Sequence, residues 1–305
     1  MISIAMTTYN GEKYLSEQLD SILNQTYKDF ELIICDDCSK DSTVQILNEY
    51  ATKDSRIKIF VNKQNLGFKK NFEKAILLCS GKYIALSDQD DVWTKNHLEV
   101  LHNIIGNYDI ACGNSLFVDK DGRSLNKTMY EQCQLYSEIP LEKLIYKLIF
   151  NYSPFQGACM LIKKSLIDKC LPIPENIFYH DYYFLLNACV NNKIIYIFDV
   201  INNYRQHNNN VTRDEFKSNY IVKLKKLFCG IKTDIFAYVD AVSKLYNDFP
   251  IEFYEIKKIL NNVENRHISI SDIKILKRNY KYILTKNTNK GFLKFLFKLS
   301  KLKTV

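Results

Sequence analysis

Acidic side chains gather at three places where predicted strands end, namely residues 36–37, residues 88–91 and Asp181. The second cluster has the sequence DQDD, which places three carboxylates within four positions. Carboxylates at this density repel one another unless a cation joins them. Mg²⁺ and Mn²⁺ take oxygen ligands and usually share them with substrate phosphates. The pattern predicts a divalent-cation site for phosphate chemistry, while helix caps and solvated turns remain the alternative explanation for acidic residues at strand ends.

Familiar nucleotide-binding loops are missing from the sequence. It has neither a G-x-x-x-x-G-K-[ST] nor a G-x-G-x-x-G stretch, which argues against an ordinary NTPase or dinucleotide enzyme. Nine cysteines in 305 residues, an odd number, do not form a disulfide framework. Cys35 and Cys38 make a C-x-x-C pair, but no second pair or nearby histidine completes a zinc site. We interpret that spacing as coincidence and expect reduced, mostly buried thiols.

Alternating strands and helices in the first 110 residues must position these carboxylates. Apolar runs predict strands at residues 2–7, 30–36, 57–62 and 82–87, and apolar stripes predict helices at 12–26, 40–51 and 68–79. Repeated βα units with continuous apolar strands imply an α/β fold, a parallel sheet with helices on both faces. Such sheets bind ligands at the carboxyl ends of their strands, which is where the acidic clusters lie.

The pattern loosens after Asn114. We expect two strands around the turn at residues 121–122, a helix at 141–150, a strand at 157–163, a helix at 181–192 and strands at 193–199 and 200–207. From about Asp214 onward the sequence is nearly all helical in pattern.

Six motifs in order resemble the family 2 glycosyltransferases with a GT-A fold, within them the bacterial rhamnosyltransferase-like branch. They are MTTYNGEKYLSEQLDSILNQTYKDFELIICDDCSKD, NLGFKKNF, GKYIALSDQDDVW, QGACMLIKKSLI, YHDYYFLL and YRQHNNNV. The resemblance implies a GT-A glycosyltransferase domain at residues 1–213, with a nucleotide-binding half at 1–113 and an acceptor half at 114–213. Residues 214–305 would form a helical C-terminal region.

The resemblance also implies roles for residues of the nucleotide half. Thr8, Tyr9 and Asp37 match positions that contact the nucleotide, and Asp37 would accept a hydrogen bond from the pyrimidine N3–H. Asp88 would face the ribose, and Asp90 would coordinate Mn²⁺ or Mg²⁺ on the donor's diphosphate. For Asp37 the alternative role is a cap on the next helix.

The other implied roles fall at the edge of the metal loop and in the acceptor half. Asp181 matches the general base of an inverting transfer, with a helix N-cap as the alternative role. His207 matches a histidine that completes the metal or diphosphate site, with an ordinary packed histidine as the alternative. Asp91, Trp93 and Arg205 are candidates for the acceptor or sugar pocket, with capping and packing as alternatives for the first two.

This reading predicts an inverting, metal-dependent glycosyltransferase that uses dTDP-rhamnose or a UDP-hexose. The acceptor would be a saccharide, linked to a lipid diphosphate, in bacterial O-antigen or capsule synthesis. Two alternatives are a sugar-phosphate nucleotidyltransferase and a nucleotide-sugar-binding protein without transferase activity. TTYNGEKY lacks the Gly-rich phosphate loop expected of the first, and the intact Asp37, Asp88, Asp90 and Asp181 argue against the second.

The net charge of +8 is a property of the C-terminal end. Residues 274–305 carry ten Lys and Arg and no acidic residue, which leaves a net charge of −2 on residues 1–273. This distribution argues against a nucleic-acid groove over the fold. Residues 290–305 place Phe and Leu on one helical face and Lys on the other, which fits either an in-plane membrane helix or a packed terminal helix. Without a leader or spanning segment, we expect a cytoplasmic protein or one peripheral on the inner face of the membrane.

Overall fold

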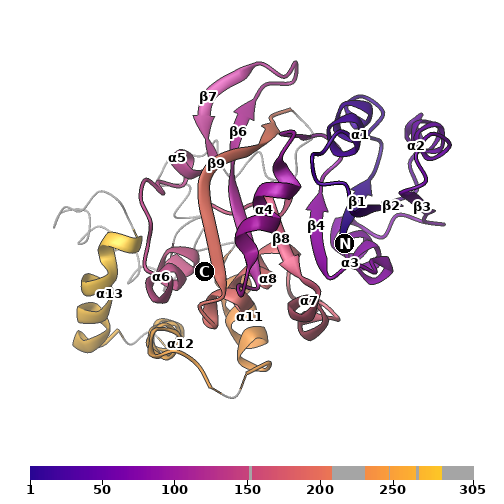
Figure 1. Cartoon of the computed structure of the whole chain (residues 1–305). Helices are drawn as coiled ribbons and strands as arrows, with labels where there is room; N and C mark the ends of the chain where they lie inside the picture. Colours follow the sequence, from indigo (N-terminus) through magenta and orange to yellow (C-terminus); the bar gives the residue numbers. More distant parts are fainter. Residues whose placement is uncertain (151–152, 208–230, 247, 266–267, 284–305) are drawn as a thin grey trace.

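A computed structural model describes residues 1–150, 153–207, 231–246, 248–265 and 268–283 (Figure 1). The strands are β1 (Ile2–Thr8), β2 (Phe30–Asp36), β3 (Ile57–Val61), β4 (Tyr83–Ser87), β5 (Val92–Trp93), β6 (Ile110–Val118), β7 (Ser124–Thr128), β8 (Met160–Lys163) and β9 (Ile194–Arg205). The helices are α1 (Leu15–Leu23), α2 (Thr43–Ala51), α3 (Phe68–Leu78), α4 (His97–Ile105), α5 (Met129–Gln132), α6 (Leu141–Phe150), α7 (Lys164–Cys170), α8 (His180–Val190), α11 (Ile231–Ser243), α12 (Ile251–Glu264) and α13 (Ile270–Ile283).

One mixed sheet forms the centre of the molecule, with the strand order β3-β2-β1-β4-β8-β6-β9-β5 and with β7 paired to β6. β3, β2, β1 and β4 are parallel, as the βα pattern predicts. β8 is antiparallel to β4 and β6, and β6 is parallel to β9. The parallel register brings the carboxyl ends of β1, β2 and β4 to one edge of the sheet.

Apolar side chains pack on both faces of this sheet. Helices α1, α2 and α4 cover one face through fully buried leucines, namely Leu15, Leu19, Leu47, Leu98 and Leu101. Helices α3, α6, α7 and α8 cover the other face in a larger cluster that extends to α11, α12 and α13. Period-2 alternation in the strands supplies both clusters, because Ile33 of β2 faces the larger one and its neighbours Leu32 and Ile34 face the other.

Some elements differ from the sequence-based expectation. The two strands expected at 193–199 and 200–207 are one strand, β9. Its register with β6 shifts around Asn114, and exposed residues at 198–199 interrupt the buried pattern, so the sequence suggests two strands. The pattern does not predict α4, α5 and α7, which have nine, four and seven residues. α5 and α7 are shorter than the window in which helical periodicity is recognised. α4 is as long as the predicted α1 and α2, so its length does not explain why the pattern does not predict it.

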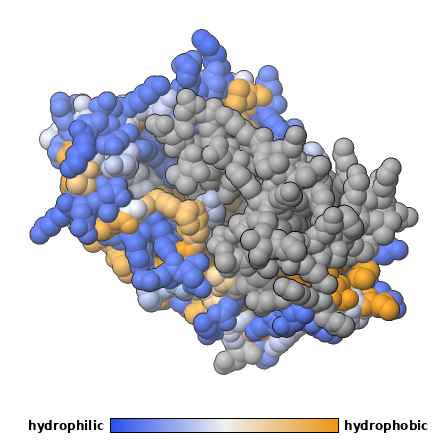
Figure 2. Space-filling model, turned by 180° about the vertical axis from the view of Figure 1, so that it is seen from behind, coloured by the Kyte–Doolittle hydropathy of each residue, from blue (hydrophilic) through white to orange (hydrophobic). Residues whose placement is uncertain are grey.

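Helices α11, α12 and α13 pack against α6 and α8 (Figure 1). Lys143 of α6 pairs with Glu252 of α12 at 2.7 Å, and Arg278 of α13 pairs with Glu255 at 2.7 Å. Within the described part of the chain, no helix is long and apolar enough to cross a membrane. Figure 2 shows mostly hydrophilic side chains on the described surface of one face. The basic segment 290–305 lies outside the described residues.

Candidate active site

The end of β1 is locked to the end of β2 by two buried side chains. Thr8 pairs with Asp36 in the parallel register, and the Thr8 hydroxyl donates to Asp36 Oδ2 at 2.8 Å. Asp36 also accepts from the Ser39 backbone N–H at 2.8 Å and from the Ser39 hydroxyl at 2.5 Å. The side chain of Thr8, predicted to contact the nucleotide, therefore serves the join between the strands. Asp36 belongs to the predicted acidic cluster 36–37, but the sequence did not assign it this structural role.

Asp37 organises the loop that leads into α3. Its Oδ1 accepts from the Leu66 N–H at 2.7 Å and from Asn62 Nδ2 at 2.9 Å, and its Oδ2 accepts from the Gly67 N–H at 2.9 Å. These donors lie ahead of α3, so Asp37 does not cap α2, the next helix along the chain. Asp41 does that instead, since its Oδ1 accepts from the Thr43 N–H at 3.0 Å.

Gln89 joins the acidic loop to the end of β1. The Tyr9 N–H donates to Gln89 Oε1 at 2.8 Å, and Gln89 Nε2 donates to the Tyr9 carbonyl at 3.1 Å. A Cβ on Gly11 would lie 2.2 Å from Gln89 Oε1, so any larger residue there would displace this amide. The Tyr9 side chain is 47% exposed. The second residue of DQDD thus links the loop to the end of β1, a role that residue type alone does not predict.

Two carboxylates of this loop and a third from later in the sequence lie near one another. Burial and the negative charges of Asp90 and Asp181 raise the pKa of Asp88 to about 7. Asp88 and Asp90 belong to the loop after β4, and Asp181 belongs to α8. The fold therefore concentrates negative charge at the position where the sequence predicts a cation.

Asp90 and His207 form a close pair. His207 Nε2 lies 2.6 Å from Asp90 Oδ2, with side chains 14% and 16% exposed. Among the described residues, no group of three or more His, Cys, Asp or Glu side chains is arranged to hold a metal ion. A cation at this pair would take one carboxylate oxygen and one imidazole nitrogen from the protein. Phosphate oxygens and water would supply its other ligands. A carboxylate oxygen beside an imidazole nitrogen fits Mn²⁺, whereas Mg²⁺ prefers oxygen ligands alone.

Arg205 and Asp91 are buried, and their hydrogen bonds join the acidic loop to β9. Arg205, 2% exposed, donates from Nε to the Asp90 carbonyl at 2.9 Å and from a terminal nitrogen to Glu17 at 2.5 Å. Asp91, 1% exposed, accepts from Asn202 Nδ2 at 2.8 Å and from the Arg205 N–H at 3.2 Å. Burial and the charges of its neighbours raise the pKa of Asp91 well above its usual range. The Asp91 carboxylate thus bonds to β9, and the Arg205 side chain, at the end of β9, bonds to the acidic loop and to α1.

Trp93 packs inside the molecule. It lies on β5, is 3% exposed and stacks on the His97 ring at a centroid distance of 4.0 Å. This position matches the packing alternative for Trp93, so we do not assign it a sugar contact.

Asp181 reaches the site from a helix N-terminus, not from a strand end as the sequence pattern suggests. It is the second residue of α8 and follows a segment, residues 171–179, without helix or strand. Its Oδ1 accepts from the Tyr182 N–H at 2.8 Å, and its Oδ2 accepts from the Gly157 N–H at 3.1 Å. Two backbone amides therefore fix the direction of the carboxylate.

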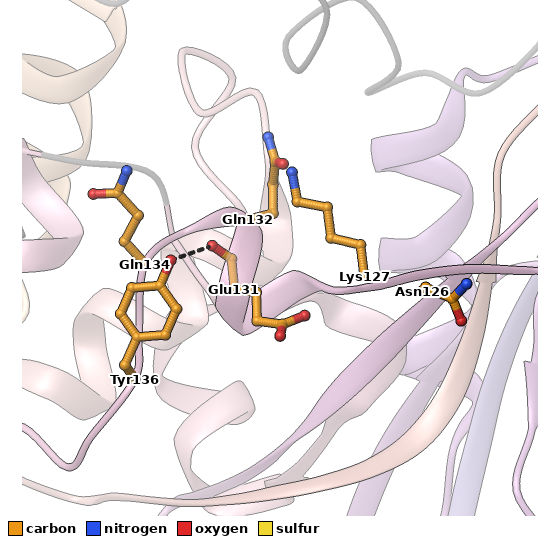
Figure 3. Close-up of a pocket in the computed structure, with 6 residues that line it drawn as sticks. All are labelled: Asn126, Lys127, Glu131, Gln132, Gln134 and Tyr136. Carbon is orange, nitrogen blue, oxygen red and sulfur yellow. Dashed lines mark hydrogen bonds between the residues drawn. The ribbon is translucent and has the colours of Figure 1, made fainter.

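A separate polar hollow of about 520 Å³ lies beside β7 and α5 (Figure 3). Its lining residues are Asn126, Lys127, Glu131, Gln132, Gln134 and Tyr136. Glu131 is engaged in a capping box with Thr128, and the Tyr136 hydroxyl donates to the Glu131 carbonyl at 3.4 Å. None of the carboxylates or the histidine described above lines this hollow, so we do not place the chemistry there.

Comparison with known proteins assigns the chain to a family. Residues 3–171, more than half of the chain, match the family model described as glycosyl transferase family 2. The chain belongs to this family. A glycosyltransferase of Methanocaldococcus jannaschii is 31% identical over 231 residues, which are 74% of this chain and 75% of that protein.

Another relative has a more specific name. The Escherichia coli UDP-Glc:alpha-D-GlcNAc-diphosphoundecaprenol beta-1,3-glucosyltransferase WfgD is 39% identical over 125 residues, which are 38% of this family 2 chain and 49% of that protein. The match therefore covers about half of the relative's length.

Solved structures confirm the GT-A fold of this glycosyltransferase. Staphylococcus aureus TarS in complex with UDP-GlcNAc aligns with a TM-score of 0.56 at 20% identity, over 93% of this chain and 81% of that one. The mannosyltransferase of Pyrobaculum calidifontis in complex with GDP-Man and Mn²⁺ aligns with a TM-score of 0.57 at 14% identity, over 99% and 84%. At these identities the likeness concerns the fold alone.

Proposed function

We propose that this glycosyltransferase is inverting and metal-dependent, and that it moves a sugar from a nucleotide-diphosphate donor to a saccharide acceptor of bacterial surface polysaccharide. The observation that carries the proposal is the loop after β4, where Asp88 and Asp90 follow the strand end and His207 Nε2 lies 2.6 Å from Asp90 Oδ2, with Asp181 near enough for its charge to raise the pKa of Asp88. The first two come from the nucleotide half and Asp181 comes from the acceptor half. One edge thus serves both substrates.

The nucleotide in this proposal lies over the ends of β1 and β2. Exposed Tyr9 offers a ring face to the base, and Asp37 Oδ2 accepts one hydrogen bond, from Gly67, and so retains a lone pair for the N3–H of uracil or thymine. Asp88 faces the ribose, while Asp90 and His207 hold the cation. When bound, that cation stabilises negative charge on the departing nucleoside diphosphate.

The transfer itself needs one base. Asp181 takes the proton from the acceptor hydroxyl while that oxygen attacks the anomeric carbon. The bond from this carbon to the diphosphate oxygen breaks, its electron pair leaves with the nucleoside diphosphate, and the configuration at the carbon inverts. Hydrogen bonds from the Tyr182 and Gly157 amides direct the carboxylate and leave a lone pair on each oxygen for the proton.

A named relative supports this choice of donor and acceptor. dTDP-rhamnose and UDP-hexoses share the pyrimidine N3–H that Asp37 would recognise. WfgD is named for UDP-Glc and a diphosphoundecaprenol-linked acceptor. We therefore favour a pyrimidine nucleotide sugar and a saccharide on a lipid diphosphate.

A thermal-shift panel of UDP, dTDP and GDP, with and without Mn²⁺, tests this proposal. A ligand that binds only the folded state increases the free energy of unfolding by mass action, by about 2.7 kcal/mol at a hundred times its dissociation constant. The unfolding temperature rises accordingly. We expect a Mn²⁺-dependent rise with UDP or dTDP and little with GDP. A larger rise with GDP would contradict the base assignment, and equal rises without Mn²⁺ would contradict the metal requirement.

A further inference from the structure

The N-terminus of α8 is held by a side chain from the C-terminal helices. Tyr179 is the N-cap residue of α8, and its side chain makes no capping hydrogen bond. The hydroxyl of Tyr238 on α11 bonds the backbone of this N-cap residue instead. It accepts from the Tyr179 N–H at 2.6 Å and donates to the Tyr179 carbonyl at 3.2 Å. Tyr238 is 2% exposed, so this hydroxyl bonds where water has little access.

Tyr238 also contacts the residue that follows Asp181. Its ring meets that of Tyr182 edge to face, with centroids 5.0 Å apart and planes at 78°. The Tyr182 hydroxyl donates to the Leu148 carbonyl of α6 at 2.8 Å. Tyr238 therefore touches the chain on both sides of Asp181, at Tyr179 and at Tyr182.

The segment before this contact is fixed from the nucleotide half. Lys69 of α3 donates to the carbonyls of Glu175 and Ile177 at 2.8 and 2.7 Å. The Tyr238 contact begins two residues further along, at Tyr179. Lys69 thus sets where residues 175–177 lie, and Tyr238 sets the last step of the chain into α8.

We propose that Tyr238 is a positioning residue for Asp181, and that the C-terminal helices thereby help to set the rate of sugar transfer. The inference rests on the proposed function, in which Asp181 is the general base. A base acts only within hydrogen-bond reach of the acceptor hydroxyl, and a misplacement of about 1 Å costs on the order of a hundredfold in rate. The Tyr238 hydroxyl acts on the backbone of Tyr179 and does not touch the reacting atoms.

The substitution Tyr238→Phe removes this hydroxyl and keeps the ring. The control is Tyr246→Phe, which removes a phenol hydroxyl from the same region that takes no part in the contact with Tyr179. The first measurement is amide hydrogen exchange at single-residue resolution. We expect faster exchange in Tyr238→Phe at Tyr179, and also at Gly157, whose N–H bonds the Asp181 carboxylate. Exchange within β1 and β4 should stay unchanged, and Tyr246→Phe should match the wild type.

The second measurement is nucleoside diphosphate release from UDP-glucose or dTDP-rhamnose with Mn²⁺, using whichever donor the wild type turns over. We expect kcat to fall tenfold or more in Tyr238→Phe, while the donor KM stays within twofold. A wild-type kcat, or a fall matched by weaker donor binding, would overturn the positioning role. Unchanged protection of Gly157 would overturn it too, and that measurement needs no donor. Absence of turnover in the wild type counts against the proposed function, and the exchange result still decides the contact.

Discussion

Asp90 and His207 stand 117 positions apart in the sequence, and the fold brings their side chains within 2.6 Å. Residue types and motif order predicted both members of this pair. They did not predict what holds the pair in place, which is Arg205 bonded to the Asp90 carbonyl and Gln89 bonded to Tyr9. Such supporting contacts depend on three-dimensional neighbours, because a buried arginine and a surface arginine look alike in one sequence.

The pair of Asp90 and His207 predicts that mutation of the histidine weakens Mn²⁺ binding. His207→Ala removes the imidazole nitrogen beside Asp90, so a cation bound there would lose one ligand. We expect the Mn²⁺ concentration for half-maximal stabilisation by UDP or dTDP to rise more than tenfold, measured by thermal shift at fixed nucleotide. His102→Ala is the matched control, because His102 lies on α4 against Tyr27 and Tyr83, away from the acidic loop. Equal Mn²⁺ dependence in both variants would contradict the assignment.

At the scale of elements, the parallel half of the sheet was predictable and the approach of α8 was not. Continuous apolar runs predict β1 to β4, and apolar stripes between them predict α1 to α3. Each of these patterns lies within one short stretch of sequence, so no knowledge of distant contacts is needed. Asp181 reaches the site through residues 171–179, which have no periodic pattern. Lys69 holds residues 175–177 of that segment and Tyr238 holds its last residue, and long-range contacts of this kind leave no local signature.

The contact of β5 with α4 predicts a pH dependence of stability. His97 is fully buried, its Nδ1 lies 2.9 Å from the Ile201 carbonyl, and burial lowers its pKa to about 4. The unfolded chain takes up a proton near pH 6.5 and the folded chain only near pH 4, so stability is full above pH 6.5 and falls as the pH drops toward 4. The loss amounts to about 3 kcal/mol.

Urea unfolding at several pH values measures this effect. In His97→Asn, where the titrating ring is absent, the difference in stability from the wild type should shift by up to about 3 kcal/mol in favour of the variant between pH 6.5 and pH 4. Parallel pH profiles for the two proteins would show that His97 does not make this contribution.

At the scale of the whole molecule, the candidate active site and the excess positive charge lie in different parts of the sequence. Residues 1–273 are almost neutral, with one cluster of their carboxylates in the loop after β4, and the excess positive charge lies in residues 274–305. The described C-terminal helices join the larger of the two cores through side chains such as Tyr238, Phe253 and Leu276. Sequence pattern indicated helices there, but it did not reveal that one of them supports α8.

The basic segment 290–305 predicts a membrane contact that is testable without knowledge of the substrates. If this segment is helical, Lys294, Lys298 and Lys301 would lie opposite its Phe and Leu stripe, a pattern that favours binding to anionic lipid surfaces. We expect removal of these residues to reduce sedimentation with vesicles that contain phosphatidylglycerol and to leave nucleotide-induced stabilisation unchanged. Undiminished vesicle binding by the shortened chain would exclude this role.

The substitution Asp181→Asn tests the central claim most directly, because it removes the base and keeps the shape of the side chain. Donor turnover and Mn²⁺-dependent nucleotide binding are measured on the same preparation. We predict that kcat falls by a factor on the order of 10² to 10⁴, the usual contribution of a general base. The stabilisation by UDP or dTDP with Mn²⁺ should match that of the wild type. Turnover at the wild-type rate in this variant would contradict the account.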